Sequence, residues 1–327
     1  MTSADRIRPT IDRVATWLAR QYQDVVTELA PLGGGFWSAA YGYRVGSEAF
    51  VLRLSDSWEG FAIDKAAMRF AGPELPVPEV LETGDALGLS FAISRRHWGI
   101  FLETVTTDEA PTAGRALDAL FAAMRALPTQ PDEPLVWHAE EPPDTTWHQW
   151  LLDGLIDHPE RRVSGWRAKL ASEPRMDRLF RTCEERIRSL LPACPERRDL
   201  VHGDLLHQNV LVSHDASTVT AIYSWKCSVR GDFLFDVAWC TFWGGGWHPG
   251  IAALDAWSRT LAAPDISEAE LCDAPARHHC YELQIAASHL GWHAWTGDAD
   301  GLEAVANRAH LILERGPLPS SQNPAEP

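Results

Sequence analysis

The stretch from residue 200 to residue 212 constrains this chain most. It begins with the apolar pair Leu200 and Val201, continues through His202-Gly203-Asp204, and ends with Asn209 and an apolar run over 210–212. Short apolar, β-branched runs on both sides of a polar segment predict a strand, a loop and a second strand. Such a loop can point the Asp204 carboxylate and the Asn209 carboxamide at the same small volume.

Asp204 and Asn209 are the residue types that phosphoryl transfer requires. An Asp can accept the proton of an attacking hydroxyl group, and an Asn can hold a magnesium ion. The spacing, with Asn209 five positions after Asp204, is that of the protein-kinase catalytic loop. Asp and Asn are also common in turns, so a polar turn between two strands is the alternative interpretation.

The composition indicates a globular protein, and its negative charge, which in most acidic proteins serves only solubility, limits the kinds of partner. At 327 residues the chain is long enough for two lobes with a sizeable core, and its 45% hydrophobic and 23% charged residues are ordinary for such proteins. The net charge of −16 argues against a nucleic-acid partner, because phosphate backbones require a basic face. A negative balance suits a small cationic substrate.

The sequence carries no targeting or membrane signal. No apolar signal peptide opens the chain, and no apolar run approaches the ~20 residues of a membrane span. The six cysteines show no zinc-ligand spacing. We therefore expect a cytoplasmic monomer with reduced thiols and no membrane partner.

A glycine-rich segment near the N-terminus is a second candidate phosphate contact. Residues 5–28 have the apolar spacing of a helix, and Pro31 lies just beyond them. Two predicted antiparallel strands, 41–45 and 50–54, follow, and the turn before them contains Gly33, Gly34, Gly35 and Ser38. Backbone amides in such a turn can approach phosphates closely because glycine has no side chain. A plain tight turn is the alternative.

Arg53, on the second of these strands, is the candidate cation. A cation at this place can pair with the α and β phosphates of a nucleotide. An outward-facing arginine on an edge strand is the alternative. Lys65, in the helical segment that follows, is a further cationic candidate.

The remaining patterns predict the lobes. Residues 75–80 are extended by their prolines, 90–94 form a strand, and the chain changes lobe between about 94 and 102. Residues 112–192 are helical with a polar interruption, a strand covers 219–223, and helices continue to residue 314. We expect an N-lobe over 1–96, a C-lobe over 97–316 and a loose tail over 317–327.

These motifs together resemble the bacterial aminoglycoside phosphotransferase family, and within it the members that act on hygromycin B. The matching segments span most of the chain: residues 51–54, 75–80, 93–96, 200–204 with Asn209, and Gly231-Asp232. The resemblance implies an α+β, protein-kinase-like fold with a small antiparallel-sheet N-lobe and a larger, mostly helical C-lobe. It also implies ATP and Mg²⁺ as cofactors.

The resemblance further assigns roles to residues. Asp204 would be the catalytic base and Asn209 a magnesium ligand. Arg53 would face the phosphates, and the Ile93–Arg96 segment, in which Ile93 and Arg95 are the named candidates, would meet the adenine. The reaction would be phosphorylation of a hydroxyl group on a cationic aminoglycoside such as hygromycin B, which confers antibiotic resistance.

Ser224 is one departure from the family pattern. The family places an Asp directly before the Trp of a Trp-x5-Gly-Asp motif, whereas this chain has Ser224 before Trp225, with Gly231 in register. That Asp is the principal metal ligand in kinases. A neutral hydroxyl is a poorer ligand, because Mg²⁺ prefers anionic oxygen. We therefore expect weak or absent transfer from the motif as written.

The substrate site is expected in the C-lobe beside Asp204. Trp239 and Trp243 are candidate walls, and Asp273 and Glu282 are candidate acidic contacts for a cation. Two other functions remain open. The chain could be a kinase for another small hydroxyl substrate, such as a macrolide or a sugar. Ser224 also fits a pseudokinase that binds nucleotide without turnover.

Overall fold

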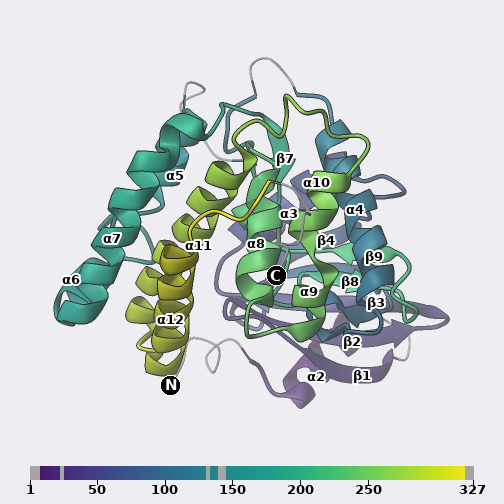
Figure 1. Cartoon of the computed structure of the whole chain (residues 1–327). Helices are drawn as coiled ribbons and strands as arrows, with labels where there is room; N and C mark the ends of the chain where they lie inside the picture. Colours follow the sequence, from purple (N-terminus) through teal and green to yellow (C-terminus); the bar gives the residue numbers. More distant parts are fainter. Residues whose placement is uncertain (1–7, 23–25, 130–132, 139–144, 321–327) are drawn as a thin grey trace. The chain divides into compact units, whose positions relative to one another are not determined.

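The structure is a computed structural model that describes residues 8–22, 26–129, 133–138 and 145–320. The chain forms two compact units (Figure 1). The first comprises Met1–Val105 and Asp204–Cys227, and the second comprises Thr106–Gly203 and Ser228–Pro327. The segment with Asp204 and Asn209 therefore belongs to the same unit as the N-terminal sheet. The lobe limits at residues 96 and 316 stay predictions, and residues 321–327 of the expected tail lie outside the described residues.

A five-stranded antiparallel sheet with the order β1-β2-β3-β5-β4 is the basis of the first unit. Its elements are α2 (Ile11–Gln21), β1 (Val26–Gly33), β2 (Ser38–Val45), β3 (Glu48–Ser55), α3 (Glu59–Ala67), η1 (Met68–Phe70), β4 (Val80–Ala86) and β5 (Leu89–Arg95). Strands β2, β3 and β5 confirm the predictions over 41–45, 50–54 and 90–94. The expected α+β, kinase-like architecture is confirmed by this sheet and by the helical remainder of the chain.

The two faces of this sheet differ in chemistry because successive side chains of a strand point to opposite faces. One face is apolar and packs against Val14 and Leu18 of α2; it contains Tyr41, Tyr43, Phe50, Leu52, Leu54, Phe91 and Ile93. The other face is lined mainly by small residues. Cross-strand pairing places Ala40, Gly42, Val51, Arg53, Ala92 and Ser94 there. Arg53 therefore lies on the small-residue face of the sheet, opposite the apolar core.

The predicted helix over 5–28 is wrong at its C-terminal end. Helix α2 ends at Gln21, and β1 begins at Val26. Residues 5–7 and 23–25 lie outside the described part of the chain. Strand β1 is at the edge of the sheet, where Pro31 can be accommodated because an edge strand leaves some N–H groups unpaired. Gly33 thus ends β1, and Gly34 and Gly35 lie between β1 and β2, so the glycines do not precede the first strand.

The first unit also contains a three-stranded sheet of order β6-β8-β9. Its strands are β6 (Ile100–Phe101), β8 (Val210–Val212) and β9 (Val219–Ile222), accompanied by η2 (Leu102–Thr104) and η4 (Trp225–Cys227). The strand before the Asp204 loop, β7 (Asp199–Val201), pairs instead with β10 (Val229–Gly231) in the second unit. The strand-loop-strand prediction is confirmed, but its two strands belong to different sheets.

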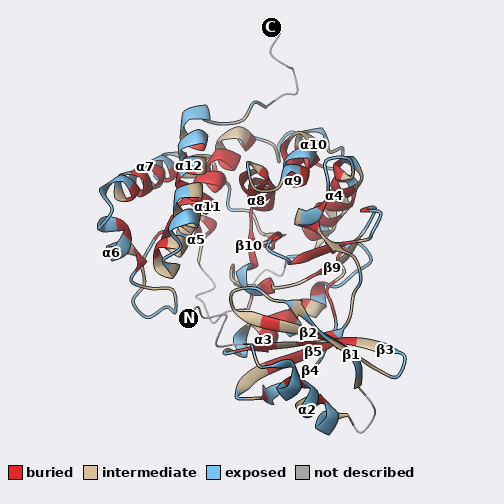
Figure 2. Ribbon diagram, turned by 90° about the horizontal axis from the view of Figure 1, so that it is seen from below, coloured by how far each residue is buried: buried red, intermediate tan, exposed pale blue. Residues whose placement is uncertain are grey.

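The second unit is mostly helical. Its helices are α4 (Ala110–Ala126), α5 (Trp147–Asp153), α6 (Trp166–Ala171), α7 (Pro174–Leu190), η3 (Leu191–Ala193), α8 (Leu234–Gly244), α9 (Pro249–Leu254), α10 (Ala256–Ala262), α11 (Ala274–Thr296) and α12 (Ala299–Arg315). Helix α11 packs against α7, α8 and α12, and both α8 and α11 are largely buried (Figure 2). A helix buried on all sides forms the core of such a unit.

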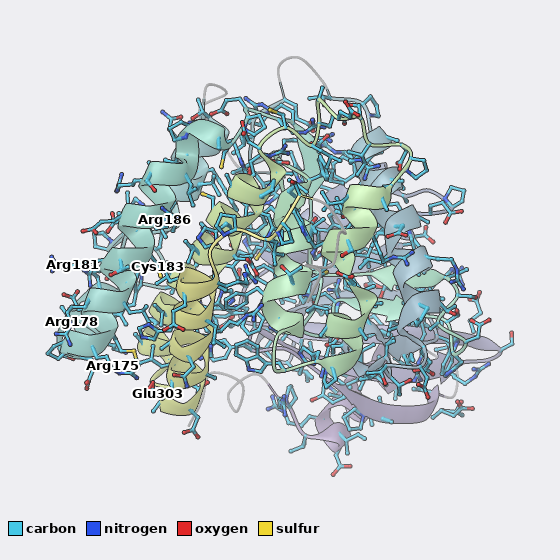
Figure 3. The ribbon with its side chains drawn as sticks, viewed as in Figure 1. Arg175, Arg178, Arg181, Cys183, Arg186 and Glu303 are labelled. Atoms are coloured by element: carbon cyan, nitrogen blue, oxygen red, sulfur yellow. The ribbon has the colours of Figure 1, made fainter. Side chains whose placement is uncertain are left out.

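Helix α7 covers one side of this core and carries a row of arginines on its exposed surface (Figure 3). One of them, Arg175, forms an exposed ion pair with Glu303 of α12. No helix in the described part of the chain is long and apolar enough to cross a membrane.

Candidate active site

The backbone that leads into the Asp204 loop is held by one buried carboxylate. The N–H groups of His202 and Gly203 each donate to Asp236 of α8, at 2.8 Å. Asp236 is 2% exposed, so these are hydrogen bonds to a buried charge, which are among the stronger ones. Gly203 has φ +74°, a conformation that glycine adopts without strain. The backbone is therefore fixed immediately before Asp204.

Asp204 is about one-fifth exposed, and both its oxygens have partners within the loop. Oδ2 accepts from Nδ2 of Asn209 at 2.9 Å, and Oδ1 lies 2.8 Å from Nδ1 of His207. Asn209 Nδ2 also donates to the Asp204 carbonyl oxygen at 2.7 Å. Leu205 and Leu206 are fully buried and anchor the loop. The structure thus joins the two residues that the sequence singled out.

His207 has a raised pKa. Burial lowers this pKa, but the hydrogen bond and the negative charge of Asp204, with a contribution from Glu103, outweigh that effect. The same hydrogen bond orients the His207 ring toward the Asp204 carboxylate.

Arg53 lies on the small-residue face of the sheet and is held by Asp64 of α3. Arg53 Nη1 donates to Asp64 Oδ2 at 2.6 Å, and both side chains are at most 16% exposed. The other oxygen, Asp64 Oδ1, accepts the backbone N–H of Trp225 at 2.9 Å. Lys65, the further candidate cation, is exposed on the same helix. One carboxylate therefore positions both the cation and the residue next to Ser224.

A chain of hydrogen bonds connects the predicted residues within the first unit. Asn209 holds Asp204 through its side chain, and the Asn209 carbonyl oxygen accepts the N–H of Tyr223 at 2.7 Å. Tyr223 is followed by Ser224 and by Trp225, whose N–H is bound by Asp64. This chain of contacts runs from the carboxylate of Asp204 to the carboxylate that holds the Arg53 guanidinium.

The glycine-rich turn reaches the same place. Gly34 has φ +152°, and a Cβ atom there would lie 2.2 Å from the carbonyl oxygen of Ser38, so this position requires glycine. A Cβ atom on Gly33 would lie 3.7 Å from Oε1 of Gln208, in the Asp204 loop. Gly35 faces open space. The turn therefore lies next to the loop that carries Asp204.

Ser224 and Asn209 do not form a fitting site for a tightly held Mg²⁺ ion. Ser224 forms no hydrogen bond with the residues that the structure describes. Its hydroxyl oxygen and Oδ1 of Asn209 are both uncharged, so neither supplies an anionic ligand to a metal ion. The nearby carboxylates of Asp204 and Asp64 are already engaged. Among the described residues, no group of three or more His, Cys, Asp or Glu side chains could hold a metal ion. Mg²⁺ prefers anionic oxygens, and this donor set lacks a free one.

Asp232 does not replace the missing carboxylate. It is fully buried, and Arg277 binds both its oxygens, with Nη2–Oδ1 at 2.7 Å and Nε–Oδ2 at 2.8 Å. The hydroxyl of Tyr281 also donates to Oδ2, at 2.7 Å. These contacts satisfy the carboxylate, so Asp232 stabilises the second unit.

The end of β5 and the residue that follows it place their side chains in different surroundings. Ile93 is 1% exposed in the apolar core, and in the sheet it lies between Leu52 of β3 and Glu82 of β4. Arg95 lies on the exterior and contacts Glu48 at 2.5 Å. Arg96, the last residue of the segment expected to meet the adenine, lies over Gly42, because a Cβ atom there would be 2.8 Å from Arg96 Nη1.

The four candidate substrate residues lie in the second unit and have different surroundings. Trp239 and Trp243 of α8 are each 6% exposed, and their ring centroids are 6.0 Å apart. Asp273 is exposed at the start of α11. Glu282 is fully buried and contacts Arg315, His278 and Arg308. Its surroundings give Glu282 a structural explanation, and we do not propose it as a substrate contact.

Asp64 is the functional residue that the sequence did not reveal. A helix after the strand that carries Arg53 was expected, and Asp64 is adjacent to Lys65, which was considered. In kinases the strand cation pairs with an acidic residue of the following helix. That relation was the available signal, because Asp64 lies 11 residues after Arg53 on such a helix.

Comparisons with known proteins agree with this geometry. A sequence model described as "Phosphotransferase enzyme family" matches residues 28–270. The hygromycin-B 4-O-kinase of Escherichia coli is 28% identical over 307 residues, which cover 90% of this chain and 82% of that protein. A crystal structure of aminoglycoside phosphotransferase APH(4)-Ia has a TM-score of 0.74 at 25% identity and covers 94% of this chain and 99% of its own. A thermostable mutant of that enzyme, in a ternary complex with AMP-PNP and hygromycin B, has a TM-score of 0.70 at 25% identity and covers 95% and 99%.

Proposed function

The chain belongs to the phosphotransferase enzyme family, and from this premise we propose that it transfers the γ-phosphoryl group of ATP to a hydroxyl group of an aminoglycoside such as hygromycin B. The hydrogen-bonded series from Asp204 through Asn209 to Asp64 and Arg53 carries the proposal. It unites a proton acceptor and a phosphate-binding cation in one unit. The similarity to the hygromycin-B 4-O-kinase supports the substrate class.

In the proposed reaction, Asp204 accepts the proton of the substrate hydroxyl group while that oxygen attacks the γ-phosphorus. A new P–O bond forms, and the bond from the γ-phosphorus to the bridging oxygen of ADP breaks. Arg53 binds the negative charge of the nucleotide phosphates, and Asp64 fixes its guanidinium. The N–H groups around Gly34 contact the phosphates from the glycine-rich turn.

The proposed substrate contacts are Trp239, Trp243 and Asp273. Aromatic edges can line a sugar ring, and the exposed Asp273 carboxylate can pair with an ammonium group of the substrate. The net charge of −16 favours a cationic substrate. We also propose a cytoplasmic monomer, since ATP is available there and the residues named for the reaction all come from one chain.

The test is ATP-dependent phosphorylation of hygromycin B by the purified chain and by Asp204→Asn. Asn has the same shape but cannot take up the proton, so we expect turnover to fall on the order of 10²–10⁴-fold with an unchanged melting temperature. Product is measured by mass spectrometry. If Asp204→Asn turns over as fast as the wild-type chain, Asp204 does not have the proposed role. If the wild-type chain phosphorylates a macrolide or a sugar and not hygromycin B, the proposed substrate class is wrong.

Ser224 favours a second candidate function, nucleotide binding without turnover. The site then retains Arg53 and the glycine-rich turn but lacks the carboxylate that kinases use for the metal. ATP would raise the melting temperature of the chain while no acceptor became phosphorylated. A thermal-shift series with ATP, run beside the activity assay, separates the two functions.

A further inference from the structure

Arg96 stands out on the face of the sheet that carries Arg53. It follows Ser94 by two positions, and alternation along the chain therefore places both residues on the same face. The Arg96 N–H donates to the carbonyl oxygen of Ala49 at 2.9 Å, which continues the pairing of β5 with β3. Its guanidinium extends across to Gly42, where a Cβ atom would collide with Nη1 at 2.8 Å. Glycine at position 42 therefore makes room for the cation.

The Arg96 guanidinium is held in place by its neighbours. Its central carbon lies 3.9 Å from the centroid of the Trp98 ring, a cation–π contact. The backbone around Trp98 is itself fixed, because the Trp98 carbonyl oxygen accepts from Thr220 Oγ1 at 2.9 Å and His97 Nδ1 lies 2.8 Å from the Thr220 carbonyl oxygen. The planar group is therefore oriented before any ligand arrives.

Arg96 differs from Arg53 and Arg95 in having no acidic partner. Arg53 is paired with Asp64, and Arg95 with Glu48. Arg96 forms no ion pair with any residue in the described part of the chain, although its side chain is half-buried. Burial lifts the pKa of Tyr223 to about 12, and the charges of Arg53 and Arg96 both oppose that rise, so both cations face the residue before Ser224. Among the described residues, no carboxylate engages the N–H donors of Arg96, which lie on the face of the sheet that carries Arg53.

We propose that Arg96 contacts the base of the bound nucleotide and makes the site accept guanine as well as adenine nucleotides. A guanidinium presents two parallel donors. Guanine offers two adjacent acceptors, O6 and N7, and binds such a fork through both. Adenine offers N7 beside the N6 amino group, which is itself a donor, so adenine accepts from only one of the two N–H groups of the guanidinium. The inference rests on the proposed use of a nucleotide and adds the residue that selects the base.

The experiment measures the dissociation constants of AMP-PNP and GMP-PNP by calorimetry for the wild-type chain and for Arg96→Met. Met retains the length of the side chain but has no donors. The ratio of the two constants is expected to shift toward the adenine analogue by at least about fivefold, the lower end for one bidentate contact to guanine. Arg20→Met, on α2 against the opposite face of the sheet, is the charge-matched control and is expected to leave the ratio unchanged.

Two further variants make the result specific. Gly42→Ala keeps Arg96 but pushes its guanidinium aside, and it should shift the ratio in the same direction. Arg95→Met tests the residue that the family resemblance assigned to the nucleotide. A shift caused by Arg95→Met and not by Arg96→Met overturns the inference, as does wild-type binding of AMP-PNP alone.

The same calorimetric measurement separates a wrong role for Arg96 from a wrong proposed function. Binding of both analogues with a ratio that Arg96→Met leaves unmoved overturns the role of Arg96 and keeps nucleotide use intact. A wild-type chain that binds neither analogue overturns both. Melting curves of each variant identify any loss of affinity that comes from unfolding.

Discussion

Replacing Glu282 by Gln tests whether this carboxylate stabilises the second unit or binds substrate. Glu282 is fully buried in α11, where Arg315 of α12 contacts Oε2 and Thr241 Oγ1 donates to Oε1 at 3.3 Å. His278 Nδ1 lies 3.4 Å from Oε2. Gln has the same shape but no charge, so the change removes the ion pairs and leaves the packing.

The magnitude follows from the pKa of Glu282. Burial raises this pKa, but the charges and hydrogen bonds of His278 and Arg315 outweigh burial and bring it down from 4.5 to about 2. A difference of about 2.5 pKa units corresponds to roughly 3 kcal/mol of folding free energy. Because the folded-state pKa is depressed, this contribution is fully present above pH 4.5 and is lost as the pH falls toward 2.

The assay is thermal unfolding of the wild-type chain and Glu282→Gln at pH 7 and at pH 4. We expect a melting temperature about 5–10 °C lower for the variant at pH 7, and a smaller difference at pH 4 as the unfolded wild-type chain begins to take up a proton at Glu282. Glu303→Gln is the matched control: its ion pair with Arg175 is about half exposed, and such pairs contribute at most about 1 kcal/mol (Figure 3). An unchanged melting temperature with a raised KM for hygromycin B would refute the structural explanation.

Three further predictions concern the reaction itself. Ser224→Asp introduces a carboxylate at φ +66°, a conformation that Asp tolerates well. In a metal titration, the Mg²⁺ concentration for half-maximal activity should fall at least about tenfold, because Mg²⁺ prefers anionic oxygen. An unchanged Mg²⁺ requirement would show that another group holds the metal. Asp64→Asn releases Arg53 and should lower kcat/KM on the order of 10²-fold. The control is Glu59→Gln: Glu59 lies on the same helix as Asp64, its ion pair with Lys226 is exposed, and its loss should change kcat/KM less than twofold. Equal losses in the two variants would argue against the role of Asp64. Gly34→Ala forces the turn away from the Ser38 carbonyl and should weaken ATP binding roughly tenfold. Gly35→Ala, at a position that faces open space, should weaken it less. A larger loss of ATP affinity for Gly35→Ala in calorimetry would contradict the geometry.

The sequence predicted the parts of the site that depend on short-range spacing. Asp204 and Asn209 lie in one loop, and the four residues between them are few enough to bring their side chains together. The strands that carry Arg53 and the glycine-rich turn follow from apolar alternation and turn residues. Each of these features is encoded within about ten neighbouring residues.

Features that depend on distant contacts were not predictable in the same way. The first three residues of β1 were interpreted as the end of a helix, because a proline such as Pro31 often follows a helix. Proline also occurs on edge strands, and only the position of β1 in the sheet decides between the two. Glu282 was a candidate substrate contact until α11 was seen to bury it against Arg315, 33 positions away. Arg96 belonged to the segment expected to meet the adenine, but the sequence did not show that its guanidinium reaches Gly42 on another strand.

Helix α8 has a consequence for how this protein can change over time. The helix carries Asp236, which fixes the backbone before Asp204, and one turn further on it carries Trp239 and then Trp243. A mutation that moves α8 to reshape the surroundings of these tryptophans also moves the carboxylate that holds His202 and Gly203. Under the proposed function, substrate range and turnover are therefore subject to the same mutations, and a lineage that acquires a new acceptor through α8 has to keep its catalytic loop in place at the same time.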